Sequence, residues 1–317
     1  MKRVLFAALL LACTQLFAQA YPSRPIRVVC TIPPGGAPDL LARTIAQSIS
    51  QTLGQPVVIE NRAGANGIIA AESVLKSPAD GYTLLVADTG NYAVTAALYA
   101  NFPYDVQKDF VPVVLAAVPA VYLVANAASP FHSVQDFVRL SKAGPPVTYG
   151  STGNGNVTHL AMEMFRMLTG ANLTHVPYKG AAGLAPALLA GDVPIGFIGY
   201  PIIAPHARAG KLRILAISTP QRAAVTPGIP TMAESGVAGY GFNISVGYLA
   251  RAGTPREIVL RLNGEINRAL NTPSVRQVLE AAGIPPLGGT PEAFGEAIRG
   301  EVEQMAALVK AAGSKVE

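Results

Sequence analysis

Short apolar runs alternate with amphipathic helical patterns along most of this chain of 317 residues. The apolar runs have the length and β-branched content of buried strands, which we expect at residues 26–32, 56–61, 82–88, 147–150, 174–178, 194–200, 212–218 and 245–251. The segments between them place apolar residues at helical spacing and predict helices at 39–53, 66–77, 133–142, from about 157, and at 183–192. A strand, a crossing helix and a second strand build a parallel sheet that helices cover. The alternation therefore predicts an α/β protein.

The alternation breaks once and then restarts, which indicates two α/β units. Residues 111–126 (VPVVLAAVPAVYLVAN) have no helical period and predict strands, whereas residues 255–313 predict three helices. No Gly/Ser-rich linker separates the units, so we expect strand-like crossings with a ligand cleft between two domains. The first domain is expected at residues 21–125 and 246–317, and the second at 126–245.

The first 20 residues have the three parts of a secretory signal peptide. A basic start and an apolar stretch are followed by Ala18–Ala20, a small-x-small cleavage site before Tyr21. We expect export to the periplasm and a mature chain that begins at Tyr21. An alternative is cleavage at the lipoprotein-like sequence that ends in Cys13, which would leave that cysteine lipidated.

Composition excludes several classes of function. The 24 basic and 19 acidic residues are mixed along the chain, and no basic run with interleaved aromatic residues predicts a nucleic-acid partner. Cys30 is the only cysteine after the leader, and it lies in the strand-like IRVVCTI, where it is expected to pack as a small hydrophobe. His159 and Glu163 share one helix face, but there is no H-E-x-x-H motif and no cysteine pair. We expect no metal and no cofactor.

Two glycine-rich loops, one in each unit, join a strand to a helix. They are TIPPGGAPD (31–39), whose Asp39 is expected to cap the helix, and YGSTGNGN (149–156). A helix N-terminus presents free amides and a positive dipole end, and glycine lets a ligand approach the backbone. We expect backbone amides at Gly35 and Gly36, and at Gly153 and Gly155, to bind an anion. The alternative is that both loops are turns selected for backbone geometry alone. Neither loop has the spacing of a nucleotide-binding motif.

Two further loops are candidates for the same cleft. Thr89 and Asn91 follow a predicted strand, and Tyr178 and Lys179 precede a predicted helix. Lys179 either pairs with an anion or is simply solvated. Ser151 is an alternative catalytic nucleophile, although it lacks the G-x-S-x-G context and would need a base supplied by the fold.

The order of these motifs resembles one known family. The segments that carry the resemblance, over residues 22–317, include YPSRPIRVV, GQPVVIENRAGANG, PADGYTLLV, KDFVPV, HVPYKG, AGKLRILAIS and GYLARAGTP, together with the two glycine-rich loops. The chain is similar to the Bug-type receptors, the periplasmic solute-binding proteins of tripartite tricarboxylate transporters. The resemblance implies a two-domain Venus-flytrap fold and a non-enzymatic, monomeric receptor. Such a receptor captures a small carboxylate and delivers it to a membrane permease.

The resemblance also implies which residues hold the carboxylate, through backbone groups and bridging waters. They are Pro34, Gly35, Gly36, Ala37 and Asp39 in the first domain, Thr89 and Asn91 beside them, and Ser151, Thr152, Gly153, Asn154, Gly155, Tyr178 and Lys179 in the second domain. The chain departs from the family pattern at Phe197–Gly199, where a polar element is common, and at Gly36–Pro38. It also has no tryptophan. Two alternative functions remain: a ligand-sensing partner of a sensor kinase, and a serine hydrolase that uses Ser151.

Overall fold

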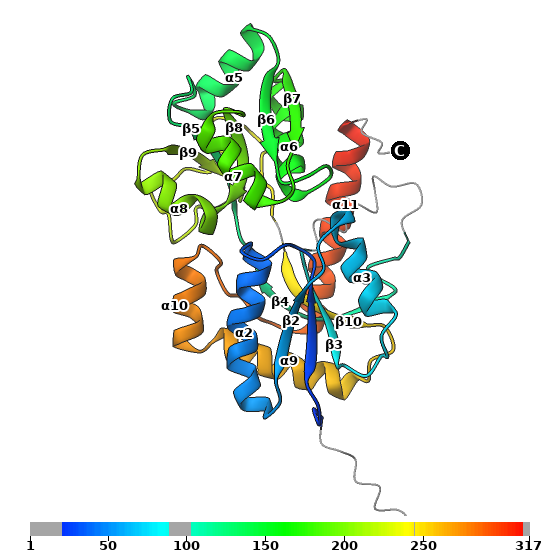
Figure 1. The fold of residues 1–317 in the computed structure, drawn as a ribbon. Coiled ribbons are helices and arrows are strands. Elements are labelled where there is room, and N and C mark those ends of the chain that lie inside the picture. Colours follow the sequence, from blue (N-terminus) through cyan, green and yellow to red (C-terminus); the bar gives the residue numbers. More distant parts are fainter. Residues whose placement is uncertain (1–20, 89–102, 244, 313–317) are drawn as a thin grey trace, which may run out of the picture.

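The computed structural model describes residues 21–88, 103–243 and 245–312. The expected leader with Cys13, and the candidate residues Thr89 and Asn91, lie outside the described residues. Two α/β lobes lie one above the other, and the chain passes between them (Figure 1). This is the two-unit α/β architecture that the alternation of patterns predicts.

The first lobe is built on a five-stranded sheet with the order β2-β1-β3-β10-β4. Its strands are β1 (Ile26–Cys30), β2 (Val57–Asn61), β3 (Thr83–Asp88), β4 (Phe110–Ala117) and β10 (Val246–Arg251). Strand β1 is parallel to β2 and β3, whereas β10 is antiparallel to both of its neighbours. One face packs on α2 (Ala37–Leu53), α9 (Arg256–Leu270) and α10 (Pro273–Ala281). The other face packs on α3 (Ile68–Leu75), which follows the short 3₁₀ helix η1 (Ala65–Gly67), and on α11 (Pro291–Ala312).

The second lobe repeats this plan with the strand order β7-β6-β8-β5-β9. Its strands are β5 (Val121–Asn126), β6 (Val147–Ser151), β7 (Leu173–Pro177), β8 (Ile195–Gly199) and β9 (Leu212–Ile217). Strand β6 is parallel to β7 and β8, and β5 is antiparallel to β8 and β9. Helices α5 (Val134–Ala143) and α6 (Val157–Thr169) cover one face, and α7 (Ala181–Ala190) and α8 (Tyr200–Arg208) cover the other.

The sheet pairing places the crossing between lobes earlier than expected. Strand β5 pairs with β8 and β9 in the second sheet, so the chain leaves the first sheet at residues 118–120, before the predicted boundary at 125. The apolar stretch 111–126 contains one strand of each sheet, and hydrophobicity alone does not show which strand belongs to which sheet. The return to the first lobe enters β10, beside the predicted boundary at 246.

Most predicted elements are present, with one omission and one refinement. Helix α8 is absent from the predictions because Pro201 at its start and Pro205 within it mask the helical pattern. Helix α7 begins at Ala181, before the predicted start at 183, and Pro186 lies inside it. Ser133 caps α5, since its side chain accepts a hydrogen bond from the Asp136 amide.

Cys30 is fully buried at the end of β1, and burial raises the pKa of its thiol to about 11. It therefore packs as a hydrophobic residue, as predicted. Within the described part of the chain, no helix has the length and apolar character needed to cross a bilayer.

Candidate functional site

The candidate loops of the two lobes meet where strands of both sheets end. In open α/β sheets, ligands bind beyond the carboxyl ends of the strands, and the loops after β1, β2, β6 and β7 all lie at such ends. The Asn66 side chain, after β2, donates a 2.9 Å hydrogen bond to the Asn154 carbonyl, after β6. The backbone at Gly180 lies against Pro33, since a methyl group added at Gly180 would be 3.4 Å from Pro33 Cγ. The lobes are therefore closed against each other at these loops.

Asp39 holds the β1–α2 loop (residues 31–36) from inside the first turn of α2. Gly36, and not Asp39, is the N-cap residue, so the predicted capping role is wrong. The buried Asp39 carboxylate instead accepts hydrogen bonds from the Gly35 amide at 3.0 Å and from Asn61 Nδ2 at 2.8 Å, and pairs with Arg43 at 3.0 Å. Burial favours the neutral acid, but the hydrogen bonds from Arg43, Asn61 and Gly35 outweigh it and lower the pKa of Asp39. The Asp39 carboxylate thus fixes the conformation of the β1–α2 loop.

Two backbone amides remain available at the start of α2. The Gly36 and Ala37 N–H groups make no hydrogen bond to the described residues, and both residues are partly exposed. Gly36 is extended, with φ −81° and ψ 170°, and Pro38 follows in the first turn. Free amides at a helix N-terminus favour an anion because the helix dipole adds to their partial positive charge.

The glycine amides of the β6–α6 loop (residues 152–156) are already occupied. The Gly153 N–H donates to Ser151 Oγ at 3.1 Å, and the Gly155 N–H donates to His159 Nδ1 at 3.0 Å. In this structure the expectation that these two amides face a ligand is wrong. Glycine is instead required by the backbone of the turn, because Gly153 has a φ of 145° and Gly155 a φ of 66°, values that other residues rarely adopt. The Asn154 amide, between them on an exposed residue, makes no hydrogen bond to the described residues.

The hydroxyl groups of this loop bind other groups of the protein. Ser151 is fully buried, and its Oγ lies 2.6 Å from His175 Nε2 and 3.1 Å from the Gly153 carbonyl oxygen. Thr152 Oγ1 donates to Asn156 Oδ1 at 2.8 Å and lies 2.9 Å from Thr158 Oγ1. These side chains define the loop's shape and present no free hydroxyl donor.

Tyr178 and Lys179 have different environments. The Tyr178 ring packs on the backbone of Gly150 and its Cβ on that of Gly183, because methyl groups added there would lie 3.4 Å from these atoms. Lys179 is exposed and forms no ion pair with any described residue. It is therefore an unpaired cation, within that part of the chain, beside the contact between Pro33 and Gly180.

A pair of stacked histidines lies under the β6–α6 loop, and the sequence patterns did not reveal it. The rings of His159 and His175 are 3.9 Å apart and nearly parallel at 6°. Tyr149, which pairs with His175 in the strand register, stacks on His175 at 5.0 Å and donates to Glu163 Oε1 at 3.0 Å. Burial and the neighbouring His159 lower the pKa of His175 to about 4, and burial also lowers the pKa of His159. Both rings are therefore neutral near pH 7.

These lowered pKa values predict that the protein loses stability in mild acid. The unfolded chain takes up a proton at His175 below about pH 6.5, whereas the folded chain resists protonation down to about pH 4, so stability falls as the pH falls through this window. We expect the free energy of unfolding to drop by about 1–3 kcal/mol between these limits, since partial exposure reduces the full effect. Urea unfolding of the wild type against His175→Asn measures it. The exposed His132→Asn is the control and should follow the wild type.

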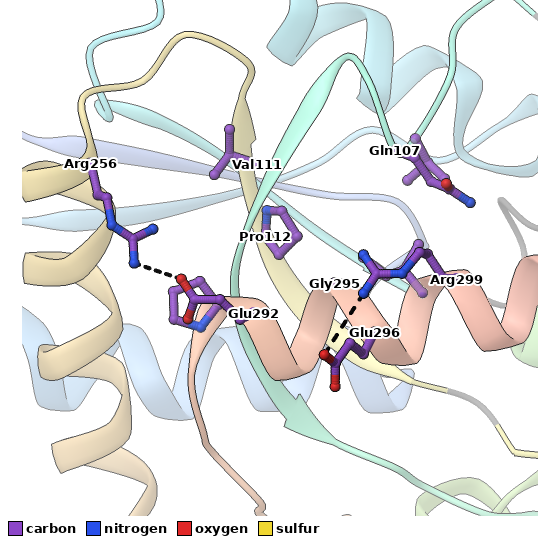
Figure 2. A pocket seen from close by; sticks show the side chains of 11 residues that line it. Gln107, Val111, Pro112, Arg256, Glu292, Gly295, Glu296 and Arg299 are labelled. Atoms are coloured by element: carbon purple, nitrogen blue, oxygen red, sulfur yellow. Dashed lines mark hydrogen bonds and ion pairs between the residues drawn. The ribbon is translucent and has the colours of Figure 1, made fainter.

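A cavity of about 450 Å³ lies away from these loops. It is in the first lobe, between β4 and the starts of α9 and α11 (Figure 2). Its two arginines face acidic partners, with Arg256 2.6 Å from Glu292 and Arg299 3.9 Å from Glu296. Their charges are therefore compensated locally, and we do not assign the cavity to the solute site. No group of three or more potential metal ligands occurs among the described residues.

Comparisons with known proteins agree with the fold and the resemblance. Residues 41–314 match the family model described as "Tripartite tricarboxylate transporter family receptor". The chain is 36% identical to protein BugT of Bordetella pertussis, over 95% of this chain and 93% of that protein. Among solved structures, it is similar to Rpa4515 of R. palustris with adipate (TM-score 0.89, 35% identity, 93% of this chain and 100% of that one). It is also similar to MatC of Rhodopseudomonas palustris with bound malate (TM-score 0.85, 30% identity, 91% and 100%).

These matches settle two of the earlier expectations. The two-domain fold is that of periplasmic solute-binding proteins of this type. The matched family consists of solute receptors and not of enzymes. The contact between Ser151 and His175 is therefore a structural one, in agreement with the complete burial of the hydroxyl.

Proposed function

The chain belongs to the tripartite tricarboxylate transporter receptor family, and we propose that it binds a small dicarboxylate between its lobes and delivers it to a membrane permease. Receptors of this family are periplasmic, and the leader-like residues 1–20 fit that location. The observation that carries the proposal is the contact between the loops of both lobes, through Asn66 and Asn154. Adipate and malate in the similar structures support a carboxylate as the solute.

We assign one carboxylate of the solute to the free backbone amides. The Gly36 and Ala37 amides of the first lobe, with Pro34 and Gly35 shaping their loop, and the Asn154 amide of the second lobe would donate to it, directly or through water. Thr89 and Asn91 are proposed to join them from the segment after β3. Ser151, Thr152, Gly153 and Gly155 set the loop's shape, and Asp39 holds the opposite loop.

Lys179 and Tyr178 are proposed to face the second carboxylate. Lys179 is exposed, has no ion-pair partner among the described residues, and lies next to the contact between lobes. A solute that touches both lobes favours the closed form, because a ligand shifts an equilibrium only by its differential affinity for the two forms. The permease would recognise the closed, monomeric receptor.

Replacement of Ala37 by proline tests the proposed carboxylate site. Proline removes the amide donor, yet it is well tolerated at the first helical position, and the extended Gly36 before it is compatible with a following proline. We expect solute affinity to fall by about 1.5–3 kcal/mol, the usual range for a hydrogen bond to a charged group, with the melting temperature of the unliganded protein nearly unchanged.

The wild type is first screened by thermal shift against mono-, di- and tricarboxylates, and calorimetric titration then gives affinities for wild type and Ala37→Pro. Absence of any carboxylate-induced stabilisation contradicts the proposed function. Unchanged affinity in a stably folded Ala37→Pro contradicts the assignment of that amide. Ala37→Ser, which keeps the N–H group, is the matched control and should bind like the wild type.

A further inference from the structure

We propose that His159 is a positioning residue for the β6–α6 loop and makes solute binding sensitive to acid. The inference rests on the proposed function, because it assumes that the loop contacts the solute. His159 lies in the first turn of α6, and its Nδ1 accepts the Gly155 N–H at 3.0 Å. An accepting Nδ1 carries no proton, so the ring is the neutral tautomer with its hydrogen on Nε2, which lies 4.0 Å from Glu163 Oε1.

His175 supports the same loop through Ser151. Its Nε2 lies 2.6 Å from Ser151 Oγ, and that oxygen accepts the Gly153 N–H. The stacked pair thus holds both glycine amides of the loop, one directly and one through a serine. Asn154 lies between these anchors, and its carbonyl receives the bond from Asn66 in the other lobe. A change at the imidazoles is therefore transmitted to the part of the loop that contacts the other lobe.

The surroundings keep both rings neutral. The charged and titratable groups that face the pair are Tyr149 from β6 and Glu163 and Arg166 from α6. Glu163 accepts a hydrogen bond from Tyr149 Oη at 3.0 Å and from Arg166 Nε at 2.8 Å. Its charge favours a protonated His159, but burial of the ring outweighs this effect, with a smaller opposing contribution from Arg166, and the pKa of His159 is lowered. Two protonated rings stacked at 3.9 Å would also repel each other.

Protonation of His159 would replace an acceptor by a donor. The Gly155 N–H would then point at a second N–H, and its hydrogen bond would be lost. The loop would leave the conformation in which Asn154 contacts the other lobe. By linkage, solute binding that requires the anchored loop favours neutral rings, so affinity falls as the pH falls toward the lowered pKa values.

The test compares the wild type with His159→Gln and His159→Leu, using adipate as the probe between pH 4.5 and 7.5. Glutamine supplies an amide oxygen that accepts the Gly155 N–H but does not titrate, whereas leucine supplies no acceptor. The protonation of adipate itself cancels in the ratio of dissociation constants between variants at each pH. We expect wild type and His159→Gln to agree within a few-fold at pH 7.5, and the wild type to lose about tenfold more affinity at pH 4.5. His159→Leu should bind weakly throughout. Parallel pH profiles for the wild type and His159→Gln, or normal binding by His159→Leu, overturn the proposal.

A second measurement uses the wild type alone, without solute. The Gly155 amide of the unliganded wild type, followed by NMR hydrogen exchange, should lose protection as the pH falls to 4.5, relative to the backbone amides within β6. Constant relative protection overturns the role of His159. Failure of adipate and all other carboxylates to bind would contradict the proposed function alone, and the amide measurement would still decide the role of His159.

Discussion

Gly196→Ala should lower the free energy of unfolding by about 3 kcal/mol or more, near the upper limit for an overpacked core position. Gly196 on β8 pairs with Gly150 on β6, and a methyl group added at Gly196 would lie 2.6 Å from the Gly150 carbonyl oxygen. The obstacle is backbone, which cannot rotate away as a side chain can. Strand β6 also leads into Ser151 and the β6–α6 loop, so any folded fraction should bind solute more weakly.

Gly264→Ala in α9 is the matched control, because the same methyl group meets open space there. Gly264 is exposed in a helix interior, and no atom lies within 4 Å of the added carbon. Alanine should raise stability by about 0.5–1 kcal/mol through its better helix propensity. Urea unfolding of the three unliganded proteins gives the comparison. A Gly196→Ala protein as stable as the wild type would show that the two strands separate at little cost.

The sequence predicts those helices and strands whose own residues show a helical or strand-like hydrophobic pattern. The runs IRVVC and TLLVA are apolar apart from Arg27 and Thr83, because both faces of their sheet are covered, and such near-continuous apolar runs predict buried strands from a single sequence. Helix α8 was not predicted because Pro201 and Pro205 interrupt its helical pattern. The boundary between the lobes was predicted at the wrong position for a different reason. Strands β4 and β5 are both apolar, and only their pairing partners assign them to different sheets.

The site was predictable as a set of loops but not as a set of contacts. Glycine-rich segments between a strand and a helix indicate where backbone can approach a ligand. Which amides remain free depends on side chains that arrive from elsewhere, such as His159 at the Gly155 amide and Asp39 at the Gly35 amide. The stacking of His159 on His175 joins α6 to β7, two elements that come together only in the folded lobe, and no spacing in the sequence encodes it.

Asn66→Asp should weaken carboxylate binding about tenfold, an effect of about 1.4 kcal/mol. The Asn66 Nδ2 group donates to the Asn154 carbonyl across the lobes, and aspartate would place a negative oxygen against that carbonyl. Asn66 has a φ of 51°, and Ala65 before it a φ of 45°, so this segment holds the side chain in a left-handed backbone that few residues tolerate. The role of Asn66 was missed because the helix predicted at 66–77 begins at this residue.

Asn66→Gly removes the hydrogen bond to the Asn154 carbonyl without adding the negative charge of Asn66→Asp. Glycine also adopts the positive φ of this position without strain. It should weaken binding by about 0.5–1.5 kcal/mol, the usual net contribution of a neutral hydrogen bond. The bond joins the lobes only when they are closed, so both variants should release solute faster while the association rate stays near that of the wild type. Stopped-flow measurement with a carboxylate that stabilises the wild type gives both rates, and thermal melts of the unliganded proteins should coincide. Equal dissociation rates for Asn66→Asp and the wild type would show that this contact does not hold the closed form.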